Sequence, residues 1–387
     1  MRKHLQITDR ENAKHHALPK YSRKVKSFDG KNSAIFFERR KLYSLYGIPI
    51  FPVPEFFDLS SNGYNDELKD FFDELDTLLS THKRIYLSFK MTKVVRLPMF
   101  LLIVALQEKH DAKIYPMYSS VSSWVNSLID AAGAFSTAET RRKSMADRNV
   151  RRIPIISGSN QEFSTLADDL VEAISHKYYN GNIPALIEAK ISQAILETLE
   201  NVGRHAYPHE RNDGNKKWWL VCSIGRVHTE SEEYMFLAIY DQGRGIPLSF
   251  EDSKVFQNRI KKYYPEEYRT LILGEEAEAN KRNIVKGFVR SLASSVISLR
   301  KTIGDSGMIY ASMMHEITRI DDENHGQGSV SIKDVITTDP ESKLLIHSCK
   351  GCYQFNRGHE KEDTKFEHKN ELPGTLLQWS IKLDELN

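Results

Sequence analysis

Hydrophobic and polar positions in the N-terminal half alternate between strand-like and helix-like segments. Two β-branched and aromatic runs, at 84–89 and 112–117, are each followed by an apolar stretch of helical length, at 97–109 and 121–132. Strand–helix–strand–helix order is typical of a parallel sheet that is covered by helices. The pattern therefore predicts a small α/β domain over residues 31–140.

A second helical pattern runs through residues 191–206. One apolar stripe that can pack on a core consists of Ile191, Ile195, Leu199, Val202 and Ala206. Glu197, Asn201 and His205 are each four residues apart, so they stack on a second face of the same helix. Pro208 ends the pattern. The segment therefore predicts a helix that presents a carboxylate, an amide and an imidazole to a cleft.

These side chains suit the phosphate end of a nucleotide site. The side-chain oxygen of Asn201 is a hard, neutral ligand of the kind that Mg²⁺ accepts beside phosphate oxygens and water. Glu197, one turn earlier, can take a proton from a water or a protein hydroxyl. Arg204 and His205 can neutralise phosphate charge. The alternative is a surface helix whose polar face is only solvated.

Two further β-branched and aromatic runs, at 218–224 and 234–240, predict neighbouring strands. Asp241 ends the second run, and Gly243 and Gly245 follow it. A carboxylate in this place can accept a hydrogen bond from the exocyclic amine of adenine, and the glycines let the backbone approach a base closely. A simple strand-ending turn, in which Asp and Gly are common, remains the alternative.

Three motifs in this order resemble those of the GHKL ATPase superfamily, which includes DNA gyrase and the histidine kinases. The spacing Glu197-x-x-x-Asn201-x-x-x-His205 resembles the N box, and the run that starts at Asp241 resembles the first glycine box. The segment 372–381 resembles the closing Gly-Thr strand of the same fold. The amino-acid sequence around Asn201 is most similar to that of anti-sigma-factor serine kinases and some histidine kinases.

The resemblance covers about residues 155–383, within a predicted ATP-binding domain at 155–387, and implies a fold and a site. It implies a two-layer α/β (α+β) sandwich with a mixed sheet, with ATP and Mg²⁺ as its cofactors. Glu197 would be the general base and Asn201 the Mg²⁺ ligand. The residues that would hold adenine are Asp241, Gly243, Gly245, Gly374 and Thr375.

The lid segment departs from the family pattern. Members carry a Gly-x-Gly phosphate loop after the first glycine box, whereas residues 274–288 contain only single glycines. Backbone N–H groups at a helix N-terminus can still hold phosphate, and Lys281 and Arg282 supply positive charge. Residues 283–301 show a core-facing apolar stripe and predict a helix.

Composition narrows the classes of partner. The chain has 387 residues, with 54 basic and 52 acidic side chains and a net charge of +2, so no global field favours nucleic acid. Basic residues crowd positions 1–30 and predict a flexible tail, with a nucleic-acid arm as the alternative. No apolar signal region follows them, and the apolar run 97–106 is too short to span a bilayer. With three cysteines, the expected compartment is the cytoplasm.

Two cysteines near the C-terminus invite a zinc interpretation. Cys349-x-x-Cys352 has His347 and His359 nearby, but a second ligand pair with matching spacing is missing. Residues 343–355 instead predict two strands around a Lys-Gly turn, which agrees with a hairpin that GHKL domains have before the Gly-Thr strand.

The predicted N-terminal domain, 31–140, resembles STAS domains, which are partners of anti-sigma-factor kinases. The phosphorylatable Asp-Ser pair of STAS antagonists is replaced here by the residues at 94–98, so the resemblance implies an interaction or sensing module. The polar, basic stretch at 141–154 is predicted to be an interdomain linker.

The expected function is a cytoplasmic Mg-ATP-binding regulatory switch that hydrolyses ATP or transfers its γ-phosphoryl group to a protein. The chain ends at Asn387, soon after the Gly-Thr strand, so no transducer domain is expected. A histidine-kinase hairpin is not expected either, and His176 is the nearest phosphoacceptor candidate. The alternative is a non-catalytic adenine-nucleotide sensor. The predicted partners are a protein substrate or regulator and a second copy of the chain; nucleic acid and membrane are not expected.

Overall fold

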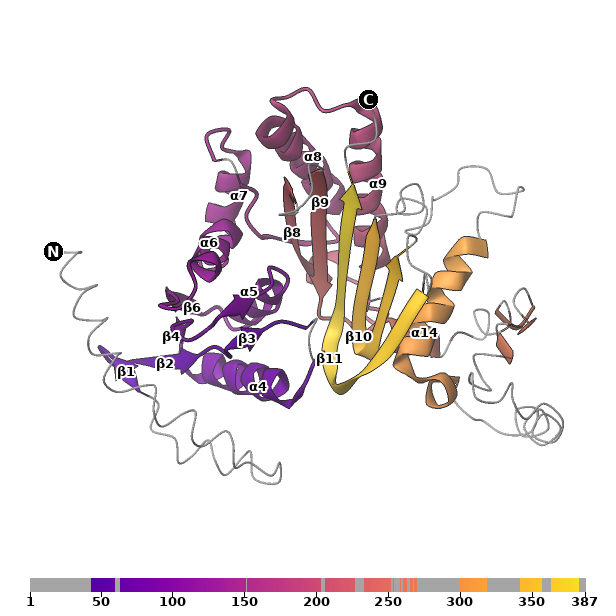
Figure 1. Cartoon of the computed structure of the whole chain (residues 1–387), viewed down its shortest axis with the longest axis horizontal. Helices are drawn as coiled ribbons and strands as arrows, with labels where there is room; N and C mark the ends of the chain where they lie inside the picture. The colour runs from indigo at the N-terminus through magenta and orange to yellow at the C-terminus, as the bar shows by residue number, and fades with distance from the viewer. Residues whose placement is uncertain are drawn as a thin grey trace.

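The chain folds into two α/β parts that pack face to face (Figure 1). The structure, a computed structural model, describes residues 43–59, 63–150, 152–202, 206–226, 233–251, 299–318, 342–356 and 363–382, together with 253, 258, 260–262, 265–266 and 268–269. We refer to residues 43–146 as the N-terminal part and to 152–382 as the C-terminal part. The mixed α/β class agrees with the prediction.

The N-terminal part is a four-stranded sheet with the order β1-β2-β4-β6. Its strands are β1 (Ser44–Leu45), β2 (Ile48–Pro52), β4 (Arg84–Ser88) and β6 (Lys113–Met117). Strands β2, β4 and β6 are parallel, as predicted, and β1 adds an antiparallel edge. A separate parallel pair joins β3 (Phe56–Phe57) to β5 (Val94–Val95). The helices are α4 (Asp66–Thr81), α5 (Met99–Lys109), α6 (Ser123–Ala132) and α7 (Ala138–Ala146).

The C-terminal part is a five-stranded sheet with the order β10-β11-β9-β8-β7. Its strands are β7 (Ile156–Ser159), β8 (Lys217–Arg226), β9 (Glu233–Asp241), β10 (Lys343–Asn356) and β11 (Asp363–Lys382). Its helices are α8 (Phe163–Tyr179), α9 (Ala185–Asn201), the short 3-10 helix η2 (Asp213–Asn215), α10 (Ile246–Glu251) and α14 (Leu299–Thr318). The predicted helix around Asn201 and the two predicted strands before Asp241 are confirmed.

The predicted mixed sheet of the C-terminal part is wrong for the described strands, because all four pairings are antiparallel. Two of these pairings, β8 with β9 and β10 with β11, join strands that are consecutive in the chain. Only a few residues separate the strands of each pair, and a parallel crossover would need a dozen or more.

The predicted hairpin at 343–355 is also wrong, since β10 is one continuous strand with a bulge in it. The bulge lies at Cys349, which has a positive φ of 52°. The Lys-Gly pair does not turn the chain because it packs on α14: Lys350 N donates to Asp305 Oδ2 over 2.9 Å. A Cβ on Gly351 would lie 2.6 Å from the Ser306 nitrogen. Gly351 thus allows β10 to pack closely on α14, whereas the sequence pattern indicated a turn at this position.

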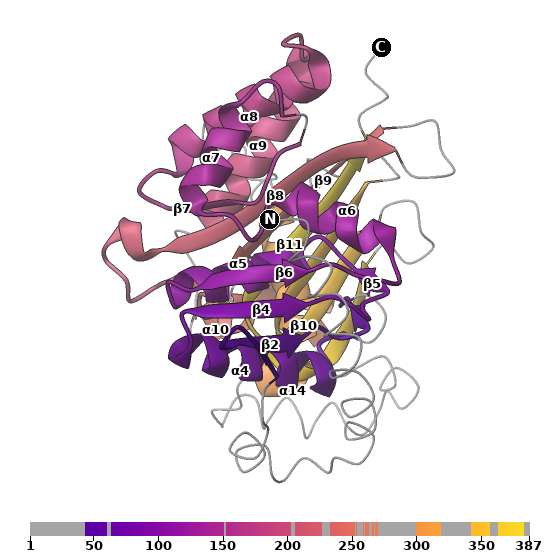
Figure 2. The same ribbon diagram turned by 90° about the vertical axis from the view of Figure 1, so that its left-hand side faces the viewer.

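The strands of the larger sheet bury side chains on both faces. On β8, Trp218, Leu220 and Cys222 face a core formed with α8, α9 and α14. Trp219 and Val221 face the opposite way, into a core shared with the N-terminal part. Figure 2 shows the smaller sheet in front of the larger one. Both faces of the larger sheet are therefore covered.

Helix α5 lies between the two sheets and is buried on every side. All residues from Met99 to Gln107 are at most 9% exposed. A helix that is apolar all round needs apolar neighbours all round, and the two parts supply them. Within the described ranges, no helix has the length and apolar character that crossing a membrane requires.

A polar network at the end of α5 joins the two parts. Glu108 Oε1 accepts hydrogen bonds from an Arg141 NH2 group and, over 2.9 Å, from Ser157 Oγ. Glu108 Oε2 accepts from Trp219 Nε1 over 2.9 Å. Arg141 is only 1% exposed and also donates from Nε to the Ile155 carbonyl over 2.8 Å. The stretch predicted as a linker therefore includes part of helix α7 and a buried cation.

Replacing Glu108 with Gln is expected to destabilise the protein by roughly 3 kcal/mol. The amide has no charge to balance the buried guanidinium, and its NH₂ group would face donors. Chemical denaturation measures the loss. Glu139→Gln is the control, because its pair with Lys143 is 77% exposed on both sides and should change stability by less than about 1 kcal/mol. Equal losses in the two variants would contradict the role of the network.

Candidate functional site

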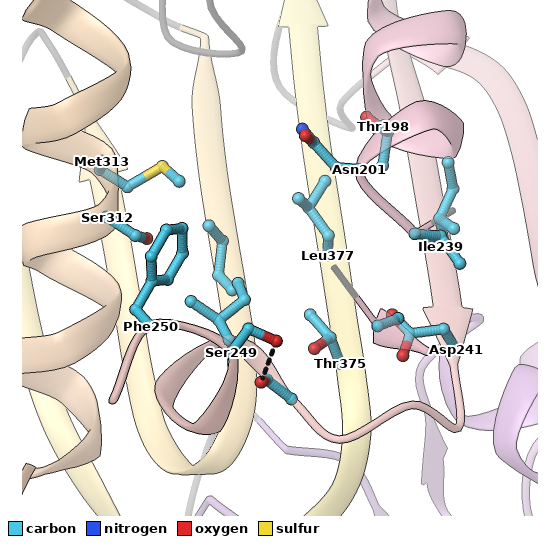
Figure 3. Close-up of a pocket in the computed structure, with 15 residues that line it drawn as sticks. Thr198, Asn201, Ile239, Asp241, Ser249, Phe250, Ser312, Met313, Thr375 and Leu377 are labelled. Carbon is cyan, nitrogen blue, oxygen red and sulfur yellow. Dashed lines mark hydrogen bonds between the residues drawn. The ribbon is translucent and has the colours of Figure 1, made fainter. Parts of the chain in front are cut away.

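A pocket opens between α9 on one side and α10 and α14 on the other, above strands β9, β11 and β10 (Figure 3). It contains about 700 Å³ of empty space, part of it continuous with solvent. The lining residues are Thr198, Asn201, Val202, Ala206, Ile239, Asp241, Gly245, Ile246, Ser249, Phe250, Ser312, Met313, Ile346, Thr375 and Leu377. Most of the lining is apolar, with a few polar groups at its two ends.

Asp241 lies at one end of the pocket, where β9 stops. It is the register partner of Thr375 on β11 and is 5% exposed. Gly243 N donates to Asp241 Oδ1 over 2.8 Å. Burial raises the pKa of Asp241 to about 7, and the bond from Gly243 offsets part of that rise. The carboxyl group is therefore held in a dry place, where, among the described residues, the hydrogen bond from Gly243 favours its charged form.

Glycines allow three segments to meet at this end. Gly374 has a φ of +81°, and a Cβ there would lie 1.9 Å from the Asp241 carbonyl oxygen. A Cβ on Gly243 would lie 2.4 Å from the Ala206 side chain. Next to it, Arg244 N donates to the Ala206 carbonyl over 2.8 Å. The residues after Asp241 thus contact both the end of the α9 segment and β11.

Ser348 on β10 completes this end of the site. It is fully buried, its Oγ lies 2.9 Å from Thr375 Oγ1, and it accepts a hydrogen bond from Ile246 N over 2.9 Å. Ser348 therefore orients the Thr375 hydroxyl that faces the pocket. Sequence reasoning missed it, because a serine within a strand pattern carries no local signal.

Asn201 and Thr198 of α9 lie at the other end of the pocket, away from Asp241 and Thr375 (Figure 3). The apolar stripe of this helix is buried, as its spacing predicts. Glu197 is 8% exposed, one turn before Asn201, and is not among the residues that line the pocket. The structure thus places Asn201, Asp241 and Thr375 on the lining of one pocket and leaves Glu197 outside that lining.

Four predicted site residues, Arg204, His205, Lys281 and Arg282, lie outside the described residues. The same holds for the basic segment 1–30, the lid segment 274–288 and most of the helix predicted at 283–301.

The wall opposite α9 was not predicted from the sequence. Ser249 and Phe250 come from α10, and Ser312 and Met313 come from α14 (Figure 3). Ser249 Oγ donates to the Gly245 carbonyl over 3.0 Å, which ties α10 to the glycine run. A regular buried face on α14 was the available signal, but such a face does not distinguish a pocket wall from a core.

Comparisons with known proteins found no match: no family model, no curated protein and no solved structure matches this chain.

Proposed function

We propose that this protein binds Mg-ATP in the pocket between α9 and α14, in the manner of GHKL ATPases, and acts as a regulatory switch. The observation that carries the proposal is the arrangement of Asp241 and Thr375 at one end of an apolar pocket and Asn201 at the other. These residues are far apart in the sequence and belong to three separate motifs.

The end that contains Asp241 suits adenine. The carboxylate can accept a hydrogen bond from the exocyclic amine, whereas the carbonyl of guanine would face it as a second acceptor. The Thr375 hydroxyl, oriented by Ser348, offers a further polar contact. Ile239, Ile346 and Leu377 supply apolar surface for the faces of the base. The missing Cβ atoms of Gly243 and Gly374 keep this end compact.

The end that contains Asn201 suits phosphate and metal. Asn201 lines the pocket, and its neutral amide oxygen is of the kind that can bind Mg²⁺ beside phosphate. Mg²⁺, when bound, would neutralise phosphate charge and orient the transferring group. By the family resemblance, Arg204, His205, Lys281 and Arg282 are the expected phosphate contacts. Asn201 is the proposed protein ligand of the ion.

Glu197 is the proposed general base, one helical turn before Asn201. In this role it would take the proton of an attacking water or of a hydroxyl on a protein substrate. Its place beside the pocket, not on its lining, favours a second candidate function, which is nucleotide sensing without turnover. In either case, occupancy of the pocket would change the binding of a protein partner or of a second copy of the chain.

Binding and turnover of Mg-ATP test the proposal on the full chain. Wild type is expected to bind ATP, and Asn201→Ala to lose the Mg²⁺ dependence of binding. Glu197→Ala is expected to bind normally and to lose turnover. Turnover that survives Glu197→Ala would mean another base, and turnover absent from wild type would select the sensor. A wild type that binds no adenine nucleotide would overturn the proposal.

The affinity for adenine is expected to fall as the pH drops below about 7. The ionised Asp241 is the stronger acceptor for the amine, and protonation removes its charge and turns one of its two oxygens into a donor. Well below the pKa, the fall should approach about tenfold per pH unit as its upper limit, which is reached if the protonated form does not bind. Calorimetric titration with adenosine measures this without interference from phosphate ionisation. A flat profile, or one that rises in acid, would contradict the role given to Asp241.

A further inference from the structure

A second cluster of chemically active side chains lies away from the nucleotide pocket. His347 and Cys352 on β10 and His368 on β11 offer ligand atoms that all lie within 4.8 Å of one another. The three residues are 1%, 0% and 4% exposed, and none of them lines the pocket. His368 belongs to a stretch of β11 that bulges out opposite Cys349 and Gly351.

The hydrogen bonds place the imidazole protons. Tyr64 N donates to His368 Nδ1 over 3.1 Å, so the proton of a neutral His368 must be on Nε2. That nitrogen lies 2.9 Å from His347 Nδ1 and donates to it. The proton of His347 is then on Nε2, which is buried and finds no hydrogen-bond partner within the described part of the chain. A buried, unpartnered imidazole nitrogen beside a thiol is an unfavourable arrangement without a ligand.

The donor set selects a class of ligand. The hydrogen bonds fit two neutral rings, each of which has one proton and one lone pair. Two neutral imidazoles and one thiol match the ligands that Zn²⁺ takes, and they lack the oxygen atoms that Mg²⁺ and Ca²⁺ require.

We propose that His347, Cys352 and His368 form a binding site for a zinc-class transition-metal ion. The ion takes one nitrogen of each imidazole and the sulfur of Cys352, whose thiol proton goes to solvent. Three protein ligands leave a fourth position for water or a further group. The proposal is independent of the nucleotide pocket, which uses none of these side chains.

The proton balance gives the site a structural consequence. Each bound imidazole keeps one proton on its other nitrogen, so Nδ1 of His368 carries either the metal or that proton. In both cases Tyr64 N–H loses its acceptor. Next to it, Asn370 N donates to the Tyr64 carbonyl over 3.2 Å, and Asn370 Nδ2 donates to Asp66 over 2.9 Å. The ion therefore lies where β11 contacts the N-terminal part. Its binding would replace one hydrogen bond of this contact, the one from Tyr64 N to His368 Nδ1.

The neighbouring cysteine provides a matched control. Cys349 shares the Cys-x-x-Cys motif, but its Sγ lies 3.8 Å from the Arg244 carbonyl oxygen, towards the glycine run of the nucleotide site. The third cysteine of the chain, Cys222, lies on β8 and faces the core formed with α8, α9 and α14. A thiolate ligand can therefore be assigned by single substitutions.

Cobalt binding tests the proposal. The full chain, freed of metal with a chelator, is titrated with Co²⁺ and then with Zn²⁺. Wild type is expected to bind one Co²⁺ with a thiolate-to-cobalt charge-transfer band, and Zn²⁺ should abolish that band. The band should disappear in Cys352→Ser and in His347→Gln and persist in Cys349→Ser, with circular dichroism confirming that each variant is folded. A wild type without the band, a band that survives Cys352→Ser, or a band lost in Cys349→Ser would overturn the site.

Discussion

Asp241→Asn is expected to abolish adenine binding and, above neutral pH, to make the empty protein more stable than wild type. Burial raises the pKa of this carboxyl in the folded protein to about 7, from the usual 3.8 of an aspartate. Folding therefore favours the protonated carboxyl. This contribution to the free energy of unfolding is fully present below the pKa of the unfolded chain and is lost as the pH rises to about 7. At about 1.4 kcal/mol per pKa unit, the strain of the ionised form has a ceiling on the order of 4 kcal/mol.

The loss of binding has a separate cause. Asn offers an oxygen that can still accept the hydrogen bond from Gly243 N, so the local fold should survive. Its NH₂ group, however, would face the adenine amine or compete with it, and the negative charge is gone. Opposite changes in stability and in binding are typical of a residue that is kept for function at a cost to the fold.

Asp305→Asn is the matched control for this prediction. Asp305 is also 5% exposed, but it pairs with Arg300 and accepts a hydrogen bond from Lys350 N. Removing its charge should lower stability at neutral pH. Denaturant unfolding on both sides of pH 7, together with ATP titration, compares the two variants. If Asp241→Asn is destabilised like Asp305→Asn at every pH, or binds ATP as wild type does, the role given to Asp241 fails.

Local periodicity accounts for the elements that could be predicted. The stripe from Ile191 to Ala206 and the run that ends at Asp241 encode a helix and a strand within a few residues each, because side-chain direction repeats with a short period. The meeting of Asp241 with Thr375 joins residues distant in the sequence, and only the family resemblance implied it. Ser348, which orients Thr375, had no motif to mark it.

The contacts between the two parts could not be predicted, because each depends on a distant partner. The apolar run of α5 is compatible with many buried helices until the second sheet is known. Arg141 lies in a polar stretch typical of a linker, and its burial depends on Glu108, 33 residues earlier. The sequence around His368 is compatible with a strand and with a loop. Its place is set by Tyr64, 304 residues earlier in the chain.

Gly374→Ala is expected to cost the largest part of the stability among single substitutions at the site, roughly 3 kcal/mol or more. Two effects add: alanine is strained at a φ of +81°, and its Cβ would lie 1.9 Å from the Asp241 carbonyl oxygen. That oxygen belongs to the backbone of β9, so relief requires β9 and β11 to separate where Asp241 and Thr375 face the pocket. Adenine binding should therefore be lost together with stability.

Gly47→Ala separates the two effects. Gly47 has a similar φ of +75°, but nothing lies within 4 Å of a Cβ there. It should show the backbone strain alone, about 1 kcal/mol, and leave nucleotide binding unchanged. Denaturant unfolding of both variants gives the difference, which measures how closely β9 and β11 approach at the site. Equal losses would mean that the two strands can separate without cost. Adenine binding that survives Gly374→Ala would remove this contact from the proposed nucleotide site.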